Sequence, residues 1–146
     1  MQTSPAFTVK TGNWDTIGLF AKPVRLEVFV AEQGVPSLLE IDPLDHIYQH
    51  VIVFDAEQKA IATARMSDDG KFGRMAVLKP YRGQGIGRLL LETVCQQAIS
   101  MAIHSIYCHA QTDATGFYQK NGFLTQGEAF EEAGISHIKM HKKLPF

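Results

Sequence analysis

Apolar positions near the start of the chain recur first with the period of a strand and then with that of a helix. Residues 6–10 alternate between apolar and polar side chains, which predicts a first strand. From residue 17 to residue 31 the apolar positions recur every three or four residues, as in an amphipathic helix, and Asn13 is placed to cap its start. Pro23 lies inside this stretch and predicts a kink or a break in the helix.

Three apolar runs follow, and short polar turns separate them. The runs span residues 48–55, 60–66 and 72–78, and the second turn, Ser-Asp-Asp-Gly over 67–70, combines four residues that favour turns. Connections this short join neighbouring antiparallel strands. The pattern therefore predicts a three-stranded antiparallel meander.

The second half of the chain predicts a helix between two strands. Apolar positions between residues 85 and 102 keep helical spacing, and a strand over 105–110 follows almost at once, so the strands before and after this helix are expected to lie parallel, as in a βαβ unit. Asp113 or Thr112 is expected to cap a short helix that Asn121-Gly122 closes. A strand from residue 123, an acidic loop or hairpin over 128–134 and a last strand over 135–144 complete the predicted order.

Length and composition narrow the class of protein. The 146 residues are expected to form one domain, 1–146, and the net charge of −1 provides no basic field for nucleic acid. No apolar run approaches the roughly 20 residues of a membrane span, and no secretory signal is visible at the start, so a cytoplasmic protein without a membrane partner is expected. Cys95 and Cys108 are expected to be buried free thiols, with a disulfide or a nucleophile as alternatives. The six histidines show no metal-ligand spacing, so no metal site is expected.

A glycine-rich segment lies where the third strand of the meander gives way to the helix. Glycines let the backbone approach a ligand closely, and the start of a helix adds unpaired amides and a partial positive charge, so such a segment suits a phosphate group. The segment consists of Arg82, Gly83, Gln84, Gly85, Ile86, Gly87 and Arg88. The alternative is a glycine-rich connection without a ligand.

Two common phosphate-binding motifs do not fit this segment. The dinucleotide fingerprint would need its third glycine at Arg88 or at Leu90, depending on the frame. The chain's only Gly-Lys pair, Gly70-Lys71, is followed by Phe72, so there is no P-loop. What remains is the pattern Arg-x-x-Gly-x-Gly.

This pattern resembles the acyl-CoA pyrophosphate loop of the Gcn5-related N-acetyltransferase (GNAT) superfamily. A second motif, Phe117-Tyr118 four residues before Gly122-Phe123, resembles the family's helix with a Phe-Tyr pair. The segments 28–36, 110–111 and 127–137 look like a bacterial branch of small, mostly uncharacterised N-acetyltransferases. The resemblance covers nearly the whole chain and implies an α+β fold with a mixed, mostly antiparallel sheet, a central βαβ unit and helices on both faces.

The resemblance also implies a reaction. An acetyl group would pass from acetyl-CoA to the primary amine of a small molecule by direct attack in a ternary complex, without a metal. In the family, Tyr118 matches the general acid that protonates the departing thiolate; the alternative is a packed aromatic beside Phe117. The implied CoA contacts are the backbone near Met75, Ala76 and Val77, the amides of 83–88, Asp113 and Phe117. Family analogy also suggests a homodimer through the last strands.

The residue that deprotonates the amine is the gap in this scheme. Many relatives place a glutamate on the strand before the loop, whereas residues 72–78 carry Arg74 and no acid. The candidates for a base or a substrate contact are Glu27, Glu32, Glu40, Asp42, His50, Glu128 and His137, of which the two histidines are more often structural.

Five acidic residues and no Lys or Arg lie between residues 26 and 45: Glu27, Glu32, Glu40, Asp42 and Asp45. They form either a solvated acidic face or a wall that attracts a cationic amine. Arg65, inside a predicted strand, needs a carboxylate from residues 40–45 or an anionic group of the substrate. Two other classes stay open, a non-catalytic acyl-CoA-binding or sensor domain and a nucleotide-binding regulator. The intact Tyr118 and the loop favour the enzyme.

Overall fold

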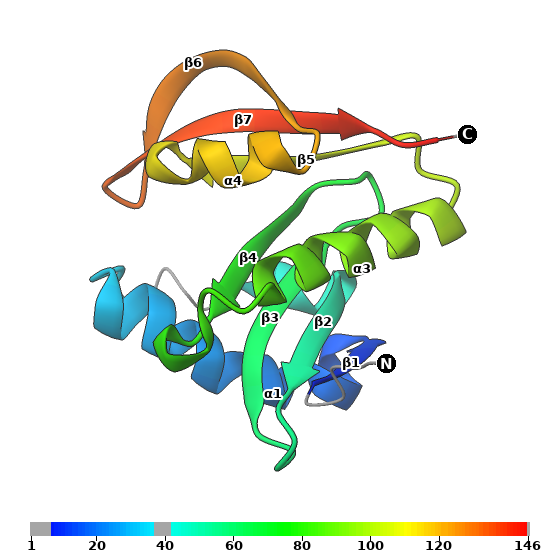
Figure 1. Ribbon diagram of the computed structural model, residues 1–146, viewed down its shortest axis with the longest axis vertical. Coiled ribbons are helices and arrows are strands. Elements are labelled where there is room, and N and C mark those ends of the chain that lie inside the picture. Colours follow the sequence, from blue (N-terminus) through cyan, green and yellow to red (C-terminus); the bar gives the residue numbers. More distant parts are fainter. Residues whose placement is uncertain (1–6, 37–41, 146) are drawn as a thin grey trace.

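The strands of the molecule lie in two antiparallel sheets. The computed structural model describes residues 7–36 and 42–145. The larger sheet has the order β1-β2-β3-β4 and the smaller one the order β5-β7-β6 (Figure 1). The strands are β1 (Thr8–Gly12), β2 (Gln49–Phe54), β3 (Ala60–Met66), β4 (Phe72–Val77), β5 (Ser105–Gln111), β6 (Leu124–Glu132) and β7 (Ile135–Lys143).

The predicted βαβ unit is present, and its two strands part almost where they meet. Lys71 and Tyr107 form a single parallel bridge, and the Tyr107 amide donates to the carbonyl of Gly70 over 3.0 Å. Beyond this bridge β4 and β5 belong to different sheets, and Figure 1 shows them diverging. The two sheets therefore form a V that opens from the bridge.

The first helix continues through its proline instead of breaking. Helix α1 (Trp14–Arg25) begins at Asn13, whose side chain accepts a hydrogen bond from the Thr16 amide over 2.9 Å. After Pro23 the chain passes directly into a π-helical segment, η1 (Leu26–Glu32). The predicted break is therefore a change of helical pitch, and π turns of this kind are frequent at functional sites.

The remaining helical segments are the short segment η2 (Pro43–Ile47), the turn η3 (Lys79–Tyr81), the long helix α3 (Ile86–Ser100), the turn η4 (Thr112–Ala114) and α4 (Thr115–Lys120). Of these segments, α3 and α4 agree with the predicted positions. Gly122 follows α4 in the left-handed region at φ 91°, as predicted. The predicted cap of α4 is wrong, because neither Asp113 nor Thr112 caps it with its side chain.

Two boundaries moved. The first strand covers Thr8–Gly12 rather than 6–10, and residues 128–132 belong to β6. A register shift between Gln126 and Phe130 bends β6, and Ala133-Gly134 closes a tight hairpin to β7 with positive φ at both residues.

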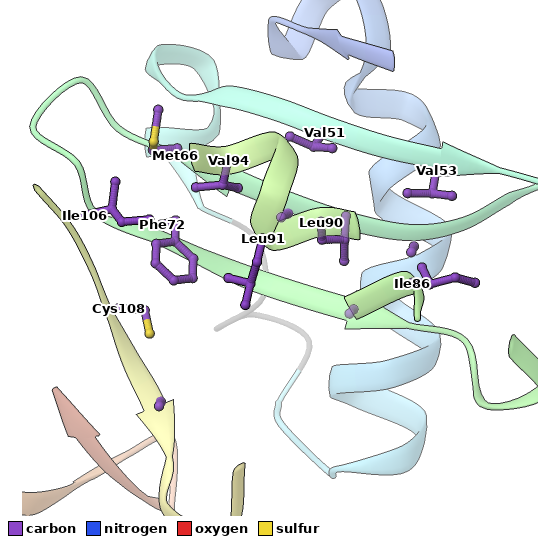
Figure 2. Packing of buried hydrophobic residues seen from close by; sticks show 14 of the residues in the cluster. Val51, Val53, Met66, Phe72, Ile86, Leu90, Leu91, Val94, Ile106 and Cys108 are labelled. Carbon is purple, nitrogen blue, oxygen red and sulfur yellow. The ribbon is translucent and has the colours of Figure 1, made fainter. Parts of the chain in front are cut away.

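Strand β2 alternates between the two faces of the larger sheet. Val51 and Val53 belong to the main core with Leu90 and Val94 of α3, as Figure 2 shows. Ile52 and Phe54 instead pack with Ile17 and Ala21 of α1. This period-2 pattern explains why α1 and α3 cover opposite faces, as the predicted fold class requires. Within the described residues no helix has the length and apolar character to cross a membrane.

Candidate active site

The glycine-rich segment forms the connection from η3 to α3 and needs its glycines for two different reasons. Gly83 and Gly85 have φ of 80° and 82°, where other residues are strained, and a Cβ at either position would meet no atom within 4 Å. A Cβ on Gly87 would lie 3.1 Å from Cζ of Phe117. Gly83 and Gly85 thus leave the space beside the loop backbone open. Gly87 allows the loop to contact Phe117 of the Phe-Tyr motif.

The amides at the start of α3 are available to a ligand. The first intrahelical bond is donated by the Leu89 amide to the Gly85 carbonyl over 3.0 Å. Helix geometry therefore leaves the amides from Ile86 to Arg88 without acceptors in their own helix. A phosphate group would meet these donors together with the positive end of the α3 dipole.

The two arginines of the segment differ in their surroundings. Arg82 donates from Nε to the Val77 carbonyl over 2.9 Å and makes a two-pronged ion pair with Glu32, at 2.7 and 3.0 Å. Arg88 pairs with Glu92, one helical turn on, at 3.4 Å. Glu32 therefore ties the end of η1 to the loop, and it does not line the cavity described below.

Tyr118 on α4 lies among aromatic rings at the opening of the V. Its ring centroid is 5.1 Å from that of Phe117 and 5.7 Å from that of Phe123, and its hydroxyl lies 3.7 Å from Sδ of Met75 on β4. Burial, with a smaller contribution from Cys108, raises the pKa of Tyr118 far above its usual value. The phenol is therefore protonated at neutral pH and able to donate.

Cys108 on β5 stays a neutral thiol. Burial raises its pKa to about 12, and a hydrogen bond from Tyr118 opposes this shift only in part. Both cysteines are free, as predicted. Since the thiolate is the nucleophilic form, this environment disfavours the alternative of a nucleophilic cysteine.

A cavity of about 530 Å³ occupies the opening of the V. A hydrogen bond of 2.9 Å between the amides of Gln111 and Gln33 closes one side of it, joining β5 to the end of η1. The lining comes from η1, the segment around η2, the start of β4, β5, α4 and the β6–β7 hairpin: Phe29, Gln33, Val35, Asp42, Leu44, Tyr48, Arg65, Lys71 to Met75, Cys108, His109, Gln111, Ala114, Tyr118, Glu132, Ala133, Ile135 and His137.

Strand β4 bulges where it borders the cavity. Thr63 pairs with Ala76 and Arg65 with Gly73, so β4 has one residue more than β3 between these pairs. Arg74 takes a φ of 48° to accommodate the extra residue. A bulge of this kind turns part of the backbone out of the regular ladder, next to Met75 and the Tyr118 hydroxyl.

The two aspartates of the acidic segment, Asp42 and Asp45, do not form an acidic wall, because both are paired with arginines. Asp45 accepts from Arg25 over 2.9 Å and from Arg65 over 2.7 Å, while Asp42 accepts from Arg65 over 2.7 Å and lies 3.6 Å from Arg74. Burial opposes ionisation of both carboxyls, yet hydrogen bonds and the arginine charges outweigh it and lower both pKa values. The expected carboxylate partner of Arg65 is thus confirmed.

The other candidate bases are dispersed. Glu27 on η1 and Glu128 on β6 are exposed and lie outside the cavity lining, and Glu40 lies outside the described residues. His50 is fully buried, its Nε2 lies 2.9 Å from the Asp45 carbonyl, and burial lowers its pKa. Of these candidates, Asp42 and His137 line the cavity.

Sequence reasoning missed the pair formed by His109 and Glu132, which also lines the cavity. Nδ1 of His109 lies 2.9 Å from a carboxylate oxygen of Glu132. The two residues are 23 positions apart and meet only through the register of β5, β7 and β6. Alternation along β5 places His109 and Gln111 on one face, but nothing local in the sequence indicates the partner strand.

The V, the glycine-rich loop and the phenol define the class of protein. The family model described as "Acetyltransferase (GNAT) domain" matches residues 22–144. The chain belongs to this family and is an acetyltransferase, as the sequence motifs predicted.

Individual relatives agree with this assignment. The chain is 39% identical over 122 residues to the N-acetyltransferase YjcF of Bacillus subtilis, covering 82% of this chain and 87% of the relative. The crystal structure of an acyl-CoA N-acyltransferase from Pseudomonas aeruginosa is similar with a TM-score of 0.84 and 27% identity, covering 94% and 99% of the two chains. A GNAT acetyltransferase from Elizabethkingia anophelis, solved with acetyl-CoA bound, shares the fold with a TM-score of 0.69 and 17% identity, covering 97% and 100%.

Proposed function

We propose that this chain transfers an acetyl group from acetyl-CoA to the primary amine of a small molecule, by direct attack within a ternary complex. The observation that carries the proposal is the position of Tyr118. Its protonated hydroxyl lies beside Met75 at the bulge of β4, in the cavity between the diverging strands. A proton donor at this place suits the departure of a thiolate.

The donor side of the site comprises Arg82–Arg88 and the start of α4. The amides of Gly83 to Arg88 would bind the pyrophosphate of acetyl-CoA, with Arg82 and Arg88 adding charge. Phe117 would pack beside the ligand, next to Gly87. Asp113 is exposed in η4, just before α4, and would lie at the edge of this side.

The backbone of β4 would hold the thioester. Amides near Met75, Ala76 and Val77 would pair with the pantetheine as a neighbouring strand does and would polarise the thioester carbonyl. Donors directed at a developing oxyanion contribute about 3–4 kcal/mol in enzymes generally. The bulge at Arg74 and Met75 supports this role, because it redirects the backbone exactly where the two sheets separate.

The acceptor side comprises the cavity walls from η1, the β6–β7 hairpin and the side chains of Asp42, Leu44 and Tyr48. Its charges are of both signs: Arg65, Lys71 and Arg74 stand against Asp42 and Glu132. Since Asp42 is already neutralised by arginine, the expectation that the acidic segment selects a cationic amine loses its support. A small polar amine fits a cavity of about 530 Å³ closed by the Gln33–Gln111 bridge.

Binding and turnover test the proposal separately. Titration calorimetry should show acetyl-CoA binding, and release of CoA should then follow addition of an amine from a panel of a monoamine, a polyamine, an amino sugar and an amino acid. Product mass should increase by one acetyl group on nitrogen. Binding without CoA release for any amine would instead indicate a non-catalytic acyl-CoA-binding domain.

A further inference from the structure

The reaction proposed above needs a group that takes a proton from the amine. An ammonium group cannot attack a thioester until it loses a proton. Strand β4 carries no acid, Glu32 and Asp42 are committed to arginines, and His50 is fully buried. Among the described residues, this leaves the walls that β5 and the β6–β7 hairpin contribute to the cavity.

His109 has the geometry of an oriented base. Its Nδ1 lies 2.9 Å from Oε1 of Glu132, and a carboxylate can only accept a hydrogen bond, so Nδ1 carries the hydrogen. The neutral ring then has its lone pair on Nε2. The side chain of His109 is 27% exposed, so solvent can later remove a proton from it.

The position of His109 complements that of Tyr118. Cys108, which contacts Tyr118, and His109 are consecutive residues of β5, and consecutive side chains point to opposite faces of a strand. Both residues border the same cavity. An acid on one side of β5 and a base on the other would enclose a thioester lying along its edge.

We propose that His109 is the general base of the acetyl transfer and that Glu132 is the positioning residue that holds its ring. Resting on the proposed function, the step is as follows. Nε2 takes a proton from the acceptor ammonium, directly or through one water, and the freed lone pair forms the C–N bond to the acetyl carbon. The C–S bond then breaks, and the thiolate takes the Tyr118 proton. The excess proton on the acetylated nitrogen passes through water to the Tyr118 phenolate, and His109 releases its proton to solvent, so both side chains return to their starting states.

Glu132 is suited to stabilise the imidazolium that forms. Burial opposes ionisation of its carboxyl, but the hydrogen bond and charge of His109, together with the charges of His137 and Lys71, outweigh burial and lower the pKa of Glu132. The carboxylate is therefore ionised at neutral pH. A negative partner at Nδ1 favours proton uptake at Nε2, as in other carboxylate–histidine pairs.

His137 is the second histidine of this wall, and its surroundings differ. Its Nδ1 donates to the backbone carbonyl of Ile135 over 2.7 Å, and its ring stacks on Phe130. The side chain is nearly buried and has a neutral partner, which does not stabilise an imidazolium as a carboxylate does. Lys139, the cross-strand partner of His109, places its ammonium over the Tyr107 ring.

The pH dependence of kcat/KM distinguishes these roles. The measurement uses acetyl-CoA and the best acceptor from the panel. His109→Gln is expected to lower kcat/KM at pH 7 by about 10²- to 10⁴-fold, the usual contribution of a general base. Its rate should rise with pH up to the pKa of the free amine, about 10 for an alkylamine. Glu132→Gln should give a smaller loss and move the midpoint of the rising limb to lower pH.

The controls separate a chemical role from a structural one. His46→Gln, at an exposed position of η2 outside the cavity, should leave the profile unchanged. Acetyl-CoA affinity by calorimetry should be unaffected in both the His109 and the Glu132 variants. His137→Gln should keep the rising limb at its wild-type position.

The outcomes divide cleanly. A wild-type protein that binds acetyl-CoA but acetylates no amine overturns the proposed function. An active wild type with an unchanged profile in His109→Gln overturns only the assignment of the base. The rising limb of the pH profile of kcat/KM could instead be lost in His137→Gln and retained in His109→Gln. That result would assign the base to His137 and would also refute the assignment to His109.

Discussion

The proposed donor side and the proposed acceptor side of the site differ in what they offer to a ligand. On the donor side seven consecutive residues, Arg82–Arg88, present backbone amides and glycine conformations at the start of one helix. On the acceptor side the lining comes from η1, the segment around η2, β3, β4, β5 and the β6–β7 hairpin, and it combines charged side chains of both signs with apolar ones. The donor side is one continuous segment of the sequence, whereas the residues of the acceptor side are brought together only by the fold.

The difference has a physical cause. A pyrophosphate is the same in every acyl-CoA, so a backbone cradle with a helix dipole suffices and needs few particular side chains. An acceptor must be distinguished from other amines, which requires polar groups at defined places in a cavity. Those groups must be neutralised or hydrogen-bonded when partly buried, as Asp42, Asp45 and Arg65 are.

The largest expected effect lies in the ion-pair network that supports the acceptor side. Asp45→Ala would leave Arg25 and Arg65, whose side chains are 3% and 10% exposed, without their shared carboxylate. Breaking a buried pair typically costs about 3–5 kcal/mol in the free energy of unfolding. Chemical denaturation should show this loss, while Asp15→Asn, at a side chain 85% exposed, should change it little.

The same network predicts a pH dependence of stability. Folding lowers the pKa of Asp42 and of Asp45 below the ordinary value of 3.8. Their contribution is therefore complete above about pH 4 and is lost as the pH falls from 3.8 through the folded-state pKa values. Thermal unfolding between pH 2 and 6 should show this decline in stability. The decline should be less steep in Asp45→Asn, which would assign part of it to the Asp45 carboxylate. Equal slopes would contradict it.

Next in size is the effect of the proton donor, which lies where the two sides meet. Tyr118→Phe keeps the ring packing against Phe117 and Phe123 and removes only the hydroxyl. Turnover should fall by about 10²- to 10³-fold, within the range for a general acid, with unchanged acetyl-CoA affinity. Steady-state kinetics and calorimetry check this. An unchanged kcat, with chemistry shown to limit the rate, would leave Tyr118 as a packed aromatic.

A smaller effect is expected where the donor side depends on its backbone. Gly85→Val forces a branched residue to a φ of 82° and places a side chain over the loop. Acetyl-CoA should bind about a hundredfold more weakly, which corresponds to about 2.7 kcal/mol. Gly127→Val is the matched control, because Gly127 on β6 has a φ of 81°, its added Cβ meets no atom within 4 Å, and it lies outside the loop and the cavity lining. Normal affinity in Gly85→Val would refute the loop assignment.

The comparison also explains what the sequence could predict. The loop, the Phe117-Tyr118 pair and the order of strands follow from short patterns, and the structure has them in the predicted places. The pairing inside the acidic segment could not be predicted in this way. Arg65 and Arg25, which pair with Asp45, lie 20 residues from it on either side. The pair of His109 and Glu132 could not be predicted from short patterns either, because it depends on the register of three strands. Charge patterns show which groups exist, and only the tertiary fold determines which of them meet.

The smallest expected effect concerns the ion pair that joins the two sides. Glu32, at the end of η1 on the acceptor side, holds the Arg82 guanidinium of the donor loop through both of its oxygens. If the loop binds pyrophosphate as proposed, Glu32 would compete with it for the same donors. Because the pair is partly exposed, its contribution is below about 1 kcal/mol. Glu32→Gln should tighten acetyl-CoA binding about two- to threefold at low salt, measured by calorimetry.

Glu92→Gln provides the matched control, since Glu92 faces Arg88 at 3.4 Å in a pair that is far more exposed. Its effect on affinity should be smaller, and added salt should reduce the difference between the two variants. Weaker binding in Glu32→Gln would mean that Glu32 orients Arg82 toward the ligand rather than competing with it. In that case η1 would serve both sides, because Gln33, the next residue, also closes the acceptor cavity through Gln111.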